Sequence, residues 1–64
     1  MTQKELLYYE DAISHEDNII KICDDMINTL EDEEIVSFME NQIQIHTNLK
    51  DKLFDVLEEK SNGW

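Results

Sequence analysis

The sequence predicts an all-α protein, an antiparallel helical hairpin that dimerises into a four-helix bundle. The 64 residues include no proline and one glycine, which disfavours turn-rich β architectures. Apolar residues recur at alternating steps of three and four in two long stretches separated by an acidic break. A chain this short buries only about 60% of its unfolded surface, and its one cysteine cannot form an internal disulfide. A lone hairpin is therefore marginal.

The first helix is predicted over about residues 3–30. Thr2 and Glu5 form a capping box, in which the two side chains satisfy free backbone N–H groups at a helix start. The apolar stripe that follows is broken at Glu16 and consists of Leu6, Tyr9, Ile13, Ile20, Cys23, Ile27 and Leu30. It is widened on one side by Ala12, Ile19 and Met26. A stripe wider than a coiled-coil seam needs two neighbouring helices.

The second helix is predicted over about residues 33–60. Asp32 suits the N-cap, and Glu33 and Glu34 then favour the positive end of the helix dipole. The second stripe runs through Ile35, Met39, Gln42, His46, Leu49, Leu53 and Val56. It is flanked by Phe38, Ile43, Ile45 and Leu57. The helix is expected to stop near Gly63, which can adopt a left-handed C-cap.

The whole chain, residues 1–64, is predicted to be one helical-hairpin domain. A lone hairpin leaves half of each apolar face in water, and two hairpins packed together cover both faces. We therefore expect a homodimer. Its predicted core consists of Leu6, Tyr9, Ile13, Ile20, Ile27, Met39, Leu49 and Leu53.

Two polar residues at core positions, Glu16 and His46, are the candidate site. In an antiparallel hairpin that turns near residue 31, residues whose numbers add to about 62 lie at the same height, so these two should face each other. One interpretation is an ion pair that fixes the register of the helices. The other is a metal site, because a carboxylate and an imidazole suit zinc or iron, and a dimer brings two of each together.

Composition excludes several classes of function. The net charge is −11 with five lysines and no arginine, which argues against binding to nucleic acid or to an anionic membrane surface. The apolar runs are too short for a membrane span or a signal peptide, so an intracellular location is expected. The serines and Cys23 lack the basic neighbours of a nucleophile, which predicts a non-enzymatic protein without a cofactor. An acidic decoy for a basic nucleic-acid-binding protein remains an alternative.

Three segments, KELLYYEDAISHE, EDEEI and QIQIHTNLKDKL, resemble the small Coat F-like spore coat proteins of spore-forming Firmicutes. The likeness covers residues from Lys4 to about Leu57, and the KELLY-x-EDA-x-x-HE block is its distinctive part. The resemblance implies a spore coat location, a structural role and other spore coat proteins as partners.

That family is regarded as ferritin-like, so the resemblance also implies a bundle whose metal ligands are a Glu from one helix and a Glu-x-x-His pair from the next. Glu16 matches the first-helix glutamate. The Glu-x-x-His pair would fall at His46 and Leu49, so its glutamate is replaced by a histidine and its own histidine is missing. Each half keeps at most two ligands, which implies a metal-binding relict rather than an oxidase or an iron store.

Overall fold

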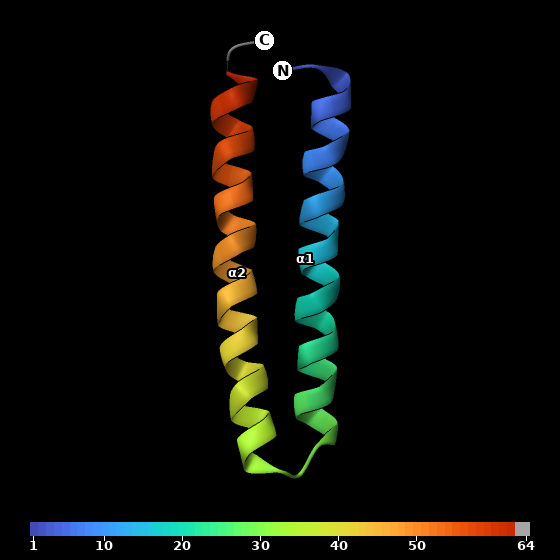
Figure 1. The fold of residues 1–64 in the computed structure, drawn as a ribbon, viewed down its shortest axis with the longest axis vertical. Coiled ribbons are helices and arrows are strands. Elements are labelled where there is room, and N and C mark those ends of the chain that lie inside the picture. Colours follow the sequence, from blue (N-terminus) through green and yellow to red (C-terminus); the bar gives the residue numbers. More distant parts are fainter. Residues whose placement is uncertain (63–64) are drawn as a thin grey trace.

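The computed structural model describes residues 1–62 and shows two long helices packed side by side in opposite directions (Figure 1). Helix α1 spans Gln3–Thr29 and α2 spans Glu33–Ser61. The all-α fold and the antiparallel hairpin are confirmed, with helix ends within a residue of the expected ones. The start of α1 and the end of α2 lie at the end of the hairpin opposite the turn (Figure 1). The C-cap expected at Gly63 falls outside the described residues.

Both helices begin as the sequence indicates. The Thr2 hydroxyl accepts from the Glu5 N–H at 3.1 Å, and the Thr2 N–H donates to the Glu5 carboxylate at 3.3 Å, which completes the capping box. The Asp32 carboxylate accepts from the N–H groups of Glu34 and Ile35, at 2.9 and 3.3 Å. These bonds satisfy backbone donors that have no partner within the helix.

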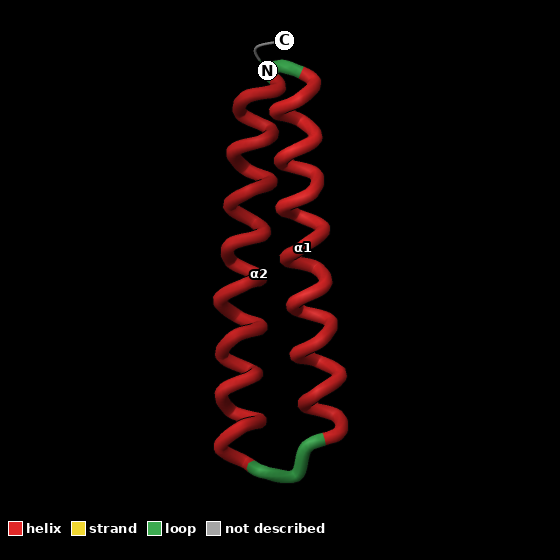
Figure 2. The backbone as a smooth tube through the Cα atoms, turned by 45° about the vertical axis from the view of Figure 1, so that its right-hand side comes forward, coloured by secondary structure: helices red, strands yellow, loops and turns green. Residues whose placement is uncertain are grey.

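A short extended segment separates the helices and is drawn green in Figure 2. Helix α1 stops after Thr29 because Leu30 turns to extended backbone, at φ −84° and ψ 143°. The Leu30 N–H still donates to the Met26 carbonyl, at 2.8 Å. Asp32 is extended as well, so the chain reverses direction within a few residues and α2 returns along α1.

The hairpin is long and thin, so it covers little apolar surface by itself. Its Cα atoms extend over 48 × 15 × 11 Å, and their radius of gyration is 14.8 Å, against about 10.7 Å for a compact domain of this length. Its accessible surface is 4931 Å², whereas a globular monomer of this mass has about 4300 Å². Among the described residues, Ile13, Glu16 and Cys23 alone are buried.

The residues of the predicted dimer core differ in how far a single hairpin buries them. Ile13 is buried, and Leu49 is 44% exposed. The remaining six are half-buried: Leu6, Tyr9, Ile20, Ile27, Met39 and Leu53. Much of the predicted core is therefore already covered by the other helix of the same hairpin, and its place in a dimer stays a prediction. Within residues 1–62, no helix has the length and apolar character needed to cross a membrane.

Candidate functional site

Glu16 and His46 meet between the two helices, at the level that the sequence predicts. Nδ1 of His46 contacts Oε2 of Glu16. An ionised carboxylate accepts hydrogen bonds only, so with Glu16 in that form the imidazole Nδ1–H is the donor. The Glu16 side chain is 11% exposed and that of His46 is 22% exposed. The pair is thus a polar contact inside an otherwise apolar seam.

One chain does not supply a complete metal site. Glu16 and His46 are two candidate ligands, and residues 1–62 contain no group of three or more His, Cys, Asp or Glu side chains placed to hold a metal ion. Structural zinc sites take four protein ligands in a tetrahedral arrangement. A second chain would have to contribute the other two.

A second ion pair, Asp17–Lys50, lies beside the first on one side of the seam. Nζ of Lys50 donates to Oδ1 of Asp17 at 2.8 Å, and the Asp17 side chain is 57% exposed. The hydrogen bond from Lys50 to Asp17 and the attraction between the two charges raise the pKa of Lys50 above its ordinary value. Both contacts join α1 to α2 at nearly the same level of the hairpin.

The other side of the seam carries most of the exposed apolar surface. Six large apolar side chains there are 41–61% exposed, and we call them the apolar face: Tyr8, Ile22, Ile35, Phe38, Ile45 and Leu49. Half-buried Ile19 and Met26 lie along the same stripe of α1. Leu7 and Phe54 are the other large apolar residues that the described structure exposes, and neither belongs to this face.

The register of the hairpin places both stripes on one side. His15 and Ile45 each precede a residue of the Glu16–His46 pair, a step of about 100° around the helix. Because the two helices are antiparallel, this one-residue step places His15 and Ile45 on the same side of the hairpin. Steps of three and four then extend the stripes, from His15 to Tyr8 and Met26, and from Ile45 to Ile35 and Leu49.

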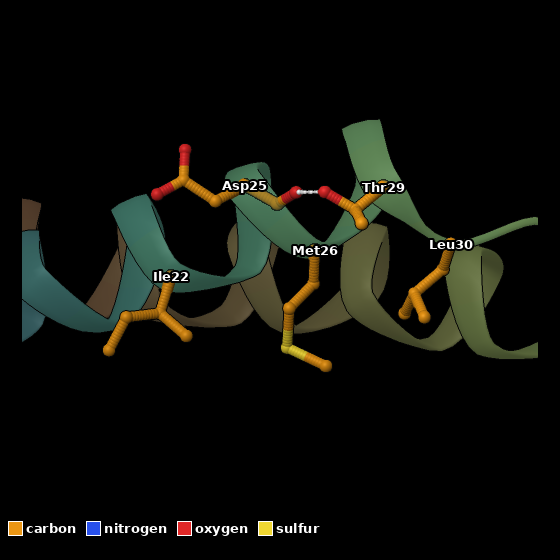
Figure 3. Close-up of a pocket in the computed structure, with 5 residues that line it drawn as sticks. All are labelled: Ile22, Asp25, Met26, Thr29 and Leu30. Carbon is orange, nitrogen blue, oxygen red and sulfur yellow. Dashed lines mark hydrogen bonds between the residues drawn. The ribbon is translucent and has the colours of Figure 1, made fainter.

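A shallow hollow lies at the turn end of the α1 stripe and is shown in Figure 3. The side chains of Ile22, Met26 and Leu30 project from the helix in a common direction, while those of Asp25 and Thr29 lie on another side. The Thr29 hydroxyl donates to the Asp25 carbonyl at 2.9 Å, so it is occupied within its own helix. The lining of the hollow is therefore mostly apolar, with Asp25 and Thr29 along one side.

Two residues of the apolar face were missed by the stripes predicted from the sequence. Ile22 and Tyr8 are outside both predicted stripes, and they are 58% and 61% exposed. The signal is a second series of three- and four-residue steps parallel to the first, through Tyr8, Ala12, His15, Ile19, Ile22 and Met26. The free thiol of Cys23, by contrast, is buried in the first stripe as expected.

Comparison of the chain with protein-family models, with curated proteins and with solved structures finds no match. The resemblance to Coat F-like spore coat proteins therefore stays a prediction.

Proposed function

We propose that this protein is a non-enzymatic structural protein that acts by pairing with a second copy of itself through the apolar face. The observation that carries the proposal is the gathering of six exposed large apolar side chains on one side of the hairpin. The whole side of the hairpin on which this face lies measures 48 × 15 Å, roughly 700 Å², and a stable interface buries about 800 Å² per partner. Two such faces in contact form a four-helix bundle.

The charge pattern supports a second copy as the occupant. Acidic residues number 16 of 64, yet the stripes from Tyr8 to Met26 and from Ile35 to Val56 that make up the face contain none. Contact between these stripes thus buries none of their own side chains as a carboxylate, which would otherwise cost several kcal/mol, and Asp25 lies at the side of the hollow. A face that is mostly apolar and has no acidic residue in its stripes is also complementary to itself, as a two-fold interface requires.

The resemblance stated above extends the proposal to a setting. The KELLYYEDAISHE block lies in α1, which carries one half of the apolar face. We propose that the dimer is a building unit of the spore coat and that other coat proteins pack against it. Its strongly acidic outer surface would then remain available for those contacts.

The test of the dimer is equilibrium sedimentation of the wild type and of two matched variants, Phe38→Glu and Phe54→Glu. Both phenylalanines are exposed residues of α2, at 57% and 49%, but Phe38 lies on the apolar face and Phe54 does not. They are about four and a half helical turns apart, and so project to nearly opposite sides. Wild type and Phe54→Glu should sediment at twice the 7.6 kDa of one chain, and Phe38→Glu should not.

A helical wild-type monomer at micromolar concentration would refute the proposal. Equal masses for the two variants would show that this face is not the interface. Circular dichroism separates loss of pairing from loss of helix, because Phe38→Glu adds its charge to a side chain that is exposed in the single hairpin.

The Glu16–His46 contact favours a second candidate function, binding of zinc or iron between two chains. Glu16 and His46 each lie near the middle of their own helix. A dimer aligned at that level therefore supplies two carboxylates and two imidazoles. Ligand binding to the folded state raises the melting temperature. Thermal melts with and without zinc, on wild type and His46→Ala, should then show a rise only in the wild type. Equal melting temperatures in the wild type with and without zinc would leave Glu16 and His46 as a structural polar layer.

A further inference from the structure

The charge of the hairpin is divided unevenly along its length. The Glu16–His46 pair lies near the middle of both helices and separates a turn half, residues 17–45, from an end half, residues 1–15 and 47–62. The turn half has eight carboxylates and one lysine, a net charge of −7. The end half has seven carboxylates and four lysines, a net charge of −3.

We infer that the two copies pack with their turns at opposite ends of the bundle. The inference rests on the dimer proposed above and adds the arrangement of its chains. If the copies pack with their turns together, the turn half of one copy, at −7, faces the turn half of the other, also at −7. If they pack with their turns apart, each turn half at −7 faces an end half at −3. Like charges repel in proportion to the product of their sizes, so the second arrangement has the lower electrostatic energy.

Lysines in the end half give this arrangement attractive contacts as well. Lys4 and Lys60 lie in the first and last turns of the two helices, at the end away from the turn. With the turns apart, these two lysines lie near the acidic segment Glu31–Glu34 of the second copy. With the turns together, the acidic segments of the two copies are neighbours. Each turn half then has a single lysine, Lys21, to offset their charge.

The apolar face permits this arrangement. A two-fold axis that crosses the helices at the level of Glu16 and His46 places each α1 against the α1 of the second copy and each α2 against its α2. Because that level is near the midpoint of Gln3–Thr29 and of Glu33–Ser61, the helices overlap along nearly their whole length. The charge distribution favours the arrangement with the turns apart.

Distances between spin labels test the arrangement separately from the dimer. In a Cys23→Ala background, one label is attached at Glu31→Cys in the turn or at Gln3→Cys at the other end, both exposed positions. With the turns apart, two turn labels are separated by about the 48 Å length of the hairpin. With the turns together, they lie within about 20 Å, since packed helices are 8–10 Å apart. A mixture of turn-labelled and end-labelled chains should show the short distance instead.

The variant Asp24→Lys/Glu40→Lys tests the cause. It brings the turn half to −3, equal to the end half, at two exposed positions that do not line the hollow. The short distance between turn labels should now appear beside the long one. A short distance in the wild type at low salt would overturn the arrangement, and a variant that keeps only the long distance would overturn its electrostatic cause. Sedimentation as a single chain would instead remove the dimer itself.

Discussion

Replacing Glu16 and His46 by alanine, singly and together, measures how much their contact stabilises the hairpin. A hydrogen bond to a charged group contributes about 1.5–3 kcal/mol when water is excluded. Here the side chains are 11% and 22% exposed, so water can replace part of the lost contact. We therefore expect a coupling free energy of about 1–2 kcal/mol from the double-mutant cycle.

The Asp17–Lys50 pair provides the control at the same level of the hairpin. It joins the same two helices at 2.8 Å, but the Asp17 side chain is 57% exposed. Exposed ion pairs contribute little because water and salt screen them. The same cycle of alanine variants at Asp17 and Lys50 should give a clearly smaller coupling, and one that declines further in salt.

The assay is urea unfolding followed by circular dichroism, with all variants at one protein concentration because pairing would make stability depend on concentration. The double replacement Glu16→Leu/His46→Leu should be as stable as the wild type or more so, since an apolar pair avoids the desolvation of a buried polar one. A coupling at Glu16–His46 no larger than that at Asp17–Lys50 would refute the reasoning that burial sets the strength of the contact.

Other substitutions test the seam and the caps. Ile20→Asp or Ile27→Asp should unfold the protein, because an unpaired carboxylate in the seam costs several kcal/mol against a total of about 5 kcal/mol; retained helix would contradict this. Asp32→Ala should lower the unfolding free energy by about 1 kcal/mol through loss of the α2 cap, measured in urea. Hydrogen bonds from Thr2 lower the pKa of Glu5 below its ordinary 4.5. The cap therefore stabilises α1 above that pH and is lost as the pH falls through the lowered value, so melts of Thr2→Ala should depend less on acid pH than those of the wild type.

The caps, the length of the helices and the level of the polar pair follow from the sequence alone. Thr2, Glu5 and Asp32 act on backbone groups two or three residues away, so local sequence is sufficient to predict their contacts. Glu16 and His46 are far apart in sequence, yet one short turn between two regular helices fixes their relative height. Because both helices are regular, the height of each residue along the hairpin follows from its number of residues to the turn.

The tertiary structure decided how the apolar residues are divided between the seam and the outside. The stripe pattern alone does not distinguish Ile13, which is 8% exposed, from Leu49, which is 44% exposed. That difference depends on how far each helix is rotated about its axis when the two pack, and rotation is set by the fit of side chains along the whole seam. The same rotation leaves Ile22 and Phe38 on one exposed face, which the stripes alone did not single out. A periodic pattern determines that a helix has an apolar side, and packing against its neighbour determines which part of that side is left for a partner.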